Sequence, residues 1–224
     1  MRLVIATRNP GKVREIRAIL AGAPELEIVG LDTLGIAESR AEDDLEVFET
    51  FEENALAKAR YFARLTGELT LADDSGICVD ALGGAPGVRS RRFAPGPDLR
   101  GEAQDAANNA HLLHMLAGRS GDERGGEYVS AAALVAPGGA EAVFMGHTRG
   151  VVLTEPRGTG GFGYDPLFYL PQEGCTFGEL PAERKNVMSH RSEAVRAAVE
   201  ALRAGLTVRD GAGTIDGLIS RGVA

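Results

Sequence analysis

Apolar positions at the start of the chain form short continuous runs and then a helical repeat. Leu3–Ala6 is an apolar run of strand length, and the polar loop Thr7–Lys12 follows it directly. Apolar residues then recur at helical spacing from Val13 to Leu20, and Leu26–Leu31 is a second strand-length run. The order strand, tight loop, helix, strand predicts a βαβ start and therefore an α/β fold.

The rest of the chain continues this mixture of elements. Further helices are predicted at Thr50–Leu65, Asp98–Ala117 and Ser192–Ala204. Further extended segments are predicted at Leu69–Ala72, Ile77–Leu82, Glu127–Ala136, Ala142–Thr148, Gly150–Leu153 and Pro166–Leu170. The acidic segment Glu38–Glu49 is predicted to be a surface loop. We expect one domain of two lobes over residues 1–204, and a Gly-rich C-terminal extension over residues 205–224.

Composition and charge narrow the classes of function. The 224 residues are 44% hydrophobic and 25% charged, which is typical of a globular protein with a core. The formal net charge of −8 argues against a protein that grips a nucleic-acid backbone. No apolar run approaches the roughly 20 residues of a membrane span, so we expect a cytoplasmic protein without membrane contact.

The loop between the first strand and helix is a candidate anion site. Backbone N–H groups at the start of a helix lack intrahelical partners and favour an anion. Gly11 permits close approach, Lys12 adds a positive charge, and Thr7 and Asn9 offer polar side chains. The same residues are equally typical of a turn with a capping residue, and the loop lacks the Walker pattern.

Glu53 allows two interpretations. Thr50 and Glu53 have the spacing of a capping box, in which the glutamate returns to the backbone at the start of its helix. As a carboxylate, Glu53 is also a candidate ligand for a metal ion.

Asp73 and Asp74 follow the predicted strand Leu69–Ala72, where ligands of open α/β sheets collect. Adjacent strand residues point to opposite faces, so both carboxylates reach one atom only if the chain turns. We expect Ser75-Gly76 to make that turn. Carboxylate oxygen suits Mg²⁺, and one carboxylate can deprotonate a bound water. An Asp-rich surface turn is the alternative.

Two later segments carry candidate base-binding residues. Phe162 lies between glycines in Gly158–Asp165, where its ring could stack on a base and Asp165 could accept from a polar edge. Lys185 and the run Ser189-His190-Arg191 offer donors for carbonyl oxygens of a purine. A Gly-rich hairpin loop and a simple helix N-cap with solvated neighbours are the respective alternatives.

Taken together, these segments resemble the inosine/xanthosine triphosphate pyrophosphatases, also called the Ham1-like family. They occur in the family's order and span residues 3 to about 204. The matching segments are Ala6–Lys12 (ATRNPGK), Phe51–Ala55 (FEENA), Ala72–Gly76 (ADDSG), Leu82–Gly87 (LGGAPG), Gly160–Pro166 (GGFGYDP) and Ser189–Arg191 (SHR).

The resemblance implies a role for each matching residue. Asp74 would be general base and metal ligand, with Glu53 helping to hold Mg²⁺ and Asp73 in support. The substrate would be contacted by the phosphate-loop residues, by Ser75, by the aromatic loop and by the donor cluster. These residues are Thr7, Arg8, Asn9, Pro10, Gly11, Lys12, Ser75, Phe162, Gly163, Tyr164, Asp165, Lys185, His190 and Arg191.

The resemblance also implies an architecture and an activity. The fold would be an elongated mixed sheet with flanking helices, its two lobes around a central cleft, in a homodimer. The enzyme would hydrolyse ITP, dITP and XTP to the monophosphate and pyrophosphate. A pyrophosphatase for other modified nucleotides and a non-catalytic nucleotide sensor remain alternatives. A dinucleotide-binding oxidoreductase is disfavoured, because no G-x-G-x-x-G follows the first strand.

Overall fold

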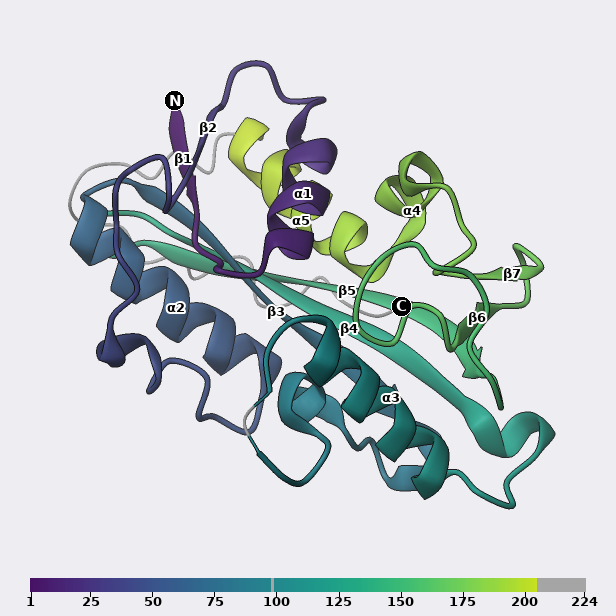
Figure 1. The fold of residues 1–224 in the computed structure, drawn as a ribbon. Helices are drawn as coiled ribbons and strands as arrows, with labels where there is room; N and C mark the ends of the chain where they lie inside the picture. Colours follow the sequence, from purple (N-terminus) through teal and green to yellow (C-terminus); the bar gives the residue numbers. More distant parts are fainter. Residues whose placement is uncertain (98, 205–224) are drawn as a thin grey trace. The chain divides into compact units, whose positions relative to one another are not determined.

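The structure is a computed structural model that describes residues 1–97 and 99–204 (Figure 1). Its helices are α1 (Pro10–Leu20), α2 (Phe51–Thr66), α3 (Glu102–Met115), α4 (Ala182–Met188) and α5 (His190–Arg203). Its strands are β1 (Arg2–Ile5), β2 (Glu27–Gly30), β3 (Leu69–Val79), β4 (Gly125–Val135), β5 (Glu141–Val152), β6 (Phe168–Leu170) and β7 (Cys175–Thr176). The predicted extension at 205–224 lies outside the described residues.

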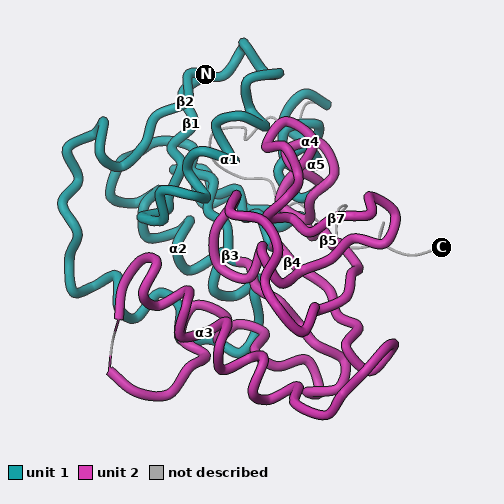
Figure 2. Tube along the Cα trace, turned by 45° about the vertical axis from the view of Figure 1, so that its right-hand side comes forward, with its two compact units in different colours: residues 1–74, 131–144, 194–224 teal, residues 75–130, 145–193 magenta. Residues whose placement is uncertain are grey.

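The chain divides into two compact units, which Figure 2 shows in different colours. Unit 1 comprises residues 1–74, 131–144 and the described part of 194–224, and unit 2 comprises residues 75–130 and 145–193. The strand order is β2-β1-β3-β4-β5 in unit 1 and β3-β4-β5-β6-β7 in unit 2, because β3, β4 and β5 each contribute residues to both units. β1 pairs in parallel with β2 and β3, whereas β5, β6 and β7 pair antiparallel. The predicted α/β class with a mixed sheet and flanking helices is therefore confirmed.

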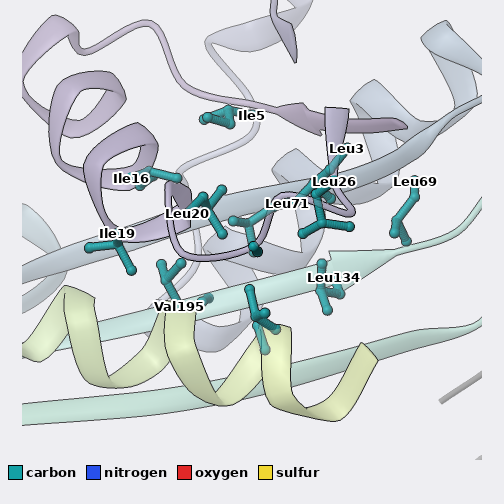
Figure 3. Close-up of a cluster of buried hydrophobic side chains, with 14 of the residues drawn as sticks. Leu3, Ile5, Ile16, Ile19, Leu20, Leu26, Leu69, Leu71, Leu134 and Val195 are labelled. Carbon is teal, nitrogen blue, oxygen red and sulfur yellow. The ribbon is translucent and has the colours of Figure 1, made fainter. Parts of the chain in front are cut away.

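The core of unit 1 lies between its sheet and two helices. Apolar side chains of α1 and α5 pack on alternate residues of β1 and β3, as Figure 3 shows for Ile16, Leu20 and Val195 against Leu3 and Leu71. All five are at most 2% exposed. The 3.6-residue period of a helix and the two-residue period of a strand bring these positions onto facing surfaces. The periodicity of residues 13–20 thus predicted both the helix and its buried face.

Both faces of the unit 1 sheet are covered. Val4 alternates with Leu3 and Ile5 along β1, yet all three have no exposed surface. The second face is covered by α2, which lies across the sheet from α1 and α5 (Figure 1). Ala55, Ala59 and Phe62 form its buried face. A parallel strand pair covered on both faces explains the continuous apolar run at residues 3–6.

Unit 2 has a core of its own, rich in aromatic side chains. Ile77, Val79 and Leu112 pack with the rings of Tyr128 and Phe168. The rings of Tyr128 and Phe168 meet edge to face, with centroids 4.8 Å apart, a favourable arrangement for aromatic pairs. Gly150 lets β5 pass close to this cluster, because a Cβ there would lie 2.7 Å from the Phe168 ring.

The sequence interpretation of β3 was wrong in one respect. We expected a strand that ends at Ala72 and a turn at Ser75-Gly76, but β3 runs unbroken from Leu69 to Val79. Asp73 is fully buried and Asp74 is 6% exposed, so the two acids lie inside the sheet. Polar residues of this kind are typical of turns, but lysine partners compensate their burial here, as the next subsection shows.

The second half of the predicted extended segment Ile77–Leu82 is instead a 3₁₀ helix, Asp80–Leu82. The other predicted elements agree with the structure apart from their ends. The predicted strands at 142–148 and 150–153 are one strand, β5, and the hairpin with β4 is present. The helix predicted from Asp98 begins at Glu102. The short elements α4 and β7 were not predicted. Within the described residues, no helix is long and apolar enough to cross a membrane.

The packing of β3 generates a first testable expectation. Leu71 has no exposed surface, so Leu71→Ala should lower the free energy of unfolding by about 2–5 kcal/mol through lost burial and a residual cavity. Leu65→Ala is the matched control, because Leu65 is 54% exposed and its truncation should change stability by less than about 0.5 kcal/mol. Urea unfolding measures both, and equal losses would contradict this account of the core.

Candidate active site

The polar loop after β1 is organised around a helix cap. Asn9 is the N-cap of α1, and its Oδ1 accepts hydrogen bonds from the backbone N–H groups of Gly11 at 2.8 Å and Lys12 at 3.1 Å. The Asn9 N–H in turn donates to Thr7 Oγ1 at 3.2 Å. Pro10 is the first residue of the helix and is exposed. The capping role considered for this loop is therefore present, and it fixes the loop against the start of α1.

Asp73 faces α1. Its carboxylate Oδ2 lies 2.7 Å from the ammonium of Lys12, and it belongs to the same side of β3 as Leu71. Asp73 is fully buried, and the Lys12 side chain is 13% exposed. A buried carboxylate requires such a partner, because desolvation of an unpaired charge is costly.

Asp74 faces α2 and a lysine there that the sequence interpretation missed. Lys58 Nζ lies 3.5 Å from Asp74 Oδ1, donates to the backbone carbonyl of Asp73 at 2.7 Å, and pairs with Glu46 Oε1 at 2.6 Å. Lys58 is 7% exposed. One buried ammonium therefore joins β3, α2 and the acidic segment that contains Glu46.

The acids and lysines of this cluster shift each other's ionisation. Burial raises the pKa of the Asp74 carboxyl above its ordinary value, and the ammonium groups of Lys58 and Lys12 offset only part of that effect. Burial alone would lower the pKa of Lys58, but the carboxylates of Asp74, Glu46 and Asp73 raise it overall. Burial thus outweighs the two lysines at Asp74, whereas the carboxylates together outweigh burial at Lys58. Asp74 is thus a carboxylate of raised basicity, as a general base requires.

Glu53 is exposed at the start of α2. Thr50 is the N-cap of that helix, its Oγ1 accepts from the Glu53 N–H at 3.2 Å, and its hydroxyl donates to Glu53 Oε2 at 2.8 Å. The side-chain half of the capping interpretation is thus present. The Glu53 carboxylate contacts the Thr50 hydroxyl and not the backbone N–H expected of a full capping box.

The donor set around Asp74 fits Mg²⁺. Asp74 Oδ2 is buried and has no hydrogen-bond partner among the described residues. An orphaned buried carboxylate oxygen is costly unless a ligand or an ion satisfies it. No group of three His, Cys, Asp or Glu side chains suited to a metal occurs within residues 1–97 and 99–204. Mg²⁺ does not need one, because it commonly binds one or two carboxylates and keeps several waters.

The glycine-rich loop in unit 2 is built around Asp165. Asp165 Oδ2 accepts from the Phe162 N–H at 2.8 Å and lies 2.5 Å from the Lys185 ammonium. A Cβ at Gly161 would lie 2.0 Å from Asp165 Oδ2, and Gly161 has a φ of +74°, so this position requires glycine. Asp165 is 2% exposed, and it therefore shapes the loop from inside.

Helix α3 holds the next residue of the loop from both sides. Asp105 Oδ2 accepts from the Gly163 N–H at 2.9 Å, and Asn109 Nδ2 donates to the Gly163 carbonyl at 3.0 Å. Tyr164 is 4% exposed and donates its hydroxyl hydrogen to the Ser90 carbonyl at 2.8 Å. The loop around Phe162 is therefore fixed by side chains of unit 2.

The predicted donor cluster gathers around the Phe162 ring. Lys185 Nζ lies 5.1 Å and Arg191 Cζ lies 5.6 Å from the ring centroid, within the range of cation–π contacts. Arg191 also donates to Ser75 Oγ at 2.7 Å. His190 stacks on Tyr128, with centroids 4.6 Å apart. Four predicted residues of unit 2 thus lie in direct contact: Ser75, Phe162, Lys185 and Arg191. His190 joins them through the Phe177 ring, whose centroid lies 5.1 Å from Lys185 Nζ and 6.3 Å from the His190 ring centroid.

The start of α5 also has the cap that was considered for it. Ser189 Oγ accepts from the Ser192 N–H at 3.2 Å, which is the contact of an N-cap side chain. The alternative of solvated neighbours was wrong, since His190 and Arg191 are each 2% exposed. Buried polar residues at a helix start are expensive unless they have a function or a fixed partner.

The sequence interpretation missed Lys58 and Glu46, and only Lys58 could have been recognised from the sequence. Lys58 is three residues after Ala55 and four before Phe62, so helical periodicity places it on the buried face of α2. A lysine on such a face is unusual and could have been noticed. Glu46 is one of six acids between Glu38 and Glu49, and nothing in the sequence distinguishes it from the others.

Together, the fold and these two residue groups define an α/β protein with a buried carboxylate–lysine cluster and a cation-backed aromatic loop. The Ham1 family model matches residues 3–201. A "dITP/XTP pyrophosphatase" of Geobacter sulfurreducens is 49% identical over 195 residues, which cover 87% of this chain and 92% of the relative. One of the same name from Thermus thermophilus is 44% identical over 210 residues, covering 94% and 96%.

Solved structures give the same result. A HAM1 protein from Coxiella burnetii aligns with a TM-score of 0.77 at 32% identity, covering 91% of this chain and 99% of that one. A nucleoside-triphosphatase / dITP/XTP pyrophosphatase from Mycobacterium abscessus aligns with a TM-score of 0.65 at 40% identity, covering 90% and 97%. The chain belongs to the Ham1 family, and the resemblance predicted from its motifs is confirmed.

The ion pair of Lys185 with Asp165 can be tested through stability. Both side chains are at most 5% exposed, so Lys185→Met should cost roughly 3–5 kcal/mol by leaving a buried carboxylate without its cation. The adjacent Arg184 is 53% exposed and pairs with Glu173, so Arg184→Met should cost less than about 1 kcal/mol. Equal costs in chemical unfolding would show that Asp165 does not depend on Lys185.

Proposed function

We infer that this protein hydrolyses non-standard purine nucleoside triphosphates, ITP, dITP and XTP, to the monophosphate and pyrophosphate. The observation that carries this conclusion is Asp74, a buried carboxylate of raised pKa that contacts Lys58 and follows the Asp73–Lys12 pair. It lies in a chain 49% identical to a protein named dITP/XTP pyrophosphatase. The enzyme would act in the cytoplasm on the free nucleotide pool.

Asp74 acts as the general base of the reaction. Its carboxylate takes a proton from a water molecule, the water oxygen bonds to the α-phosphorus, and the α–β anhydride bond breaks to release pyrophosphate. Bound Mg²⁺ would supply charge neutralisation of the phosphate chain and acidify the attacking water. Lys12 and Lys58 keep positive charge next to Asp74, which favours its ionised form. The loop Thr7–Lys12 would hold the triphosphate.

Glu53 and Glu46 are the two candidates for the second carboxylate that would hold Mg²⁺ beside Asp74. The family resemblance suggested Asp74 with Glu53, whose carboxylate contacts the Thr50 hydroxyl. Glu46 lies closer to Asp74 in the network, because both carboxylates contact the Lys58 ammonium, at 2.6 and 3.5 Å. We therefore favour Asp74 with Glu46 as the magnesium ligands, and Glu53 becomes the candidate to test against it.

The residues of unit 2 provide the basis for purine selection. Phe162 would stack on the base, and Lys185, His190 and Arg191 would donate to its C6 oxygen. ATP carries an amino group at C6, which would place a donor against these donors. A site that leaves buried polar groups unpaired discriminates strongly against the wrong substrate. Ser75, Gly163, Tyr164 and Asp165 support this contact region, and a homodimer is the assembly we expect from the family.

The function is tested by pyrophosphate release from ITP, XTP, dITP, GTP and ATP, with Mg²⁺ and with a chelator. We expect fast metal-dependent release from ITP, dITP and XTP, and release from ATP at least roughly 100-fold slower. Asp74→Asn should lower kcat by roughly 100- to 10,000-fold, because a general base contributes that much. Equal rates on every substrate would indicate a general pyrophosphatase, and nucleotide binding without release would indicate a sensor.

The ligand choice is tested by two substitutions that remove the charge of a carboxylate and keep its shape. Glu46→Gln should raise the Mg²⁺ concentration for half-maximal rate by about tenfold or more, because an uncharged amide oxygen binds Mg²⁺ more weakly than a carboxylate. Glu53→Gln keeps an acceptor for the Thr50 hydroxyl and should change the Mg²⁺ concentration for half-maximal rate by less than about threefold. A larger effect of Glu53→Gln than of Glu46→Gln would assign Glu53, and not Glu46, to the metal site.

A further inference from the structure

The Arg8 side chain is fully engaged within unit 1. Its Nε and one terminal nitrogen form a two-pronged contact with the Glu42 carboxylate, at 2.9 and 2.8 Å. Its other terminal nitrogen donates to the Ile36 carbonyl at 2.8 Å, and the first also donates to the Ala37 carbonyl at 3.1 Å. All three guanidinium nitrogens thus have partners in the segment that precedes α2.

The planar guanidinium is also packed. Arg8 Cζ lies 5.7 Å from the centroid of the Phe62 ring, a buried residue of α2. A guanidinium that is stacked on a ring and paired bidentately is held in one orientation, which a lysine cannot reproduce. Arg8 therefore has its charge directed toward Glu42, although it lies in the loop proposed to hold the triphosphate.

Glu42 connects Arg8 to the acidic segment Glu38–Glu49. Its Oε1 also accepts from the Ser39 N–H at 3.1 Å, which closes the short 3₁₀ helix η1 (Arg40–Glu42). The Leu45 N–H then donates to the Glu42 carbonyl at 3.2 Å, and the next residue is Glu46. Hydrogen bonds thus run continuously from Arg8 to the residue before Glu46.

The far end of the segment has a second anchor. Buried Asn54 accepts from the Phe48 N–H at 3.0 Å and donates to the Phe48 carbonyl at 3.3 Å. Glu46 lies between the two anchors and reaches Lys58 at 2.6 Å. The segment Glu38–Glu49 has six acids and one arginine, so its own repulsion opposes a compact arrangement near other carboxylates.

We propose that Arg8 is a positioning residue that acts through Glu42 to hold the segment 36–48 so that Glu46 stays on Lys58 beside Asp74. The inference rests on the proposed function, since it assigns Arg8 to the metal-binding carboxylates and not to the triphosphate. The rest of the acidic segment then serves to hold the Glu46 carboxylate in place. Loss of either partner of the Arg8–Glu42 pair releases the same segment.

The experiment compares Arg8→Met, Glu42→Ala and the double variant with wild type. Hydrogen exchange followed by mass spectrometry should show amides of residues 38–48 exchanging about tenfold faster or more in each variant, because local opening becomes easier. The Mg²⁺ concentration for half-maximal release from ITP should rise about tenfold, while KM for ITP at saturating Mg²⁺ changes less than about threefold. The double variant should be no worse than either single one, as expected of two partners in one contact.

Arg40→Met is the matched control, because Arg40 is exposed in the same segment and carries the same charge. Arg40→Met should leave the amide exchange and the Mg²⁺ dependence of the wild type unchanged. Arg8→Lys should recover neither property to the wild-type level, because lysine cannot pair bidentately with Glu42. A raised KM for ITP in Arg8→Met with normal exchange and normal behaviour of Glu42→Ala would overturn the proposal and return Arg8 to the triphosphate. Failure of the wild type to release pyrophosphate would instead contradict the proposed function, and the exchange result would still decide whether Arg8 holds the segment.

Discussion

The arrangement of unit 1 depends on the buried ammonium of Lys58. It lies 2.6 Å from Glu46, 3.5 Å from Asp74 and 2.7 Å from the carbonyl of Asp73, so one cation connects a helix, a strand and an irregular segment. Burial of the Asp73 and Asp74 carboxylates, with the half-buried Glu46 close by, would be prohibitive without compensation. Since Lys58 and Lys12 provide it, β3 can carry two adjacent acids through the interior of a sheet.

The alternation of side chains along β3 divides these acids between two tasks. Asp73 shares a side with Leu71 and pairs with Lys12 of α1, whereas Asp74 points to the opposite side and Lys58 of α2. The pair with Lys12 satisfies Asp73, while Asp74 keeps one buried oxygen without a partner among the described residues. The residue with the unsatisfied oxygen is therefore the one suited to bind an ion and accept a proton, and its neighbour anchors Lys12 at the start of α1.

The sequence predicted what local physics determines. Periodicity identified α1 and α2, and the capping residues Asn9 and Thr50 were considered from spacing alone. Asp73 and Asp74 were recognised as candidate site residues, but the chain was expected to turn after them, because adjacent aspartates are typical of turns. The lysines that allow these acids to lie inside a strand belong to other elements, which local propensity does not include. The contact of Glu46 with Lys58, twelve residues away in sequence, and the use of Arg8 for Glu42 depend on tertiary packing, for which one sequence contains no signal.

We propose that a water near Asp74 attacks the α-phosphorus of a non-standard purine triphosphate. The decisive experiment is hydrolysis of ITP in water enriched with heavy oxygen, with both products analysed by mass spectrometry after a single turnover. We expect the label in the phosphate of the monophosphate and none in pyrophosphate. Label in pyrophosphate would mean attack on the β-phosphorus and would contradict the assignment of Asp74 as the base for α-phosphorus attack.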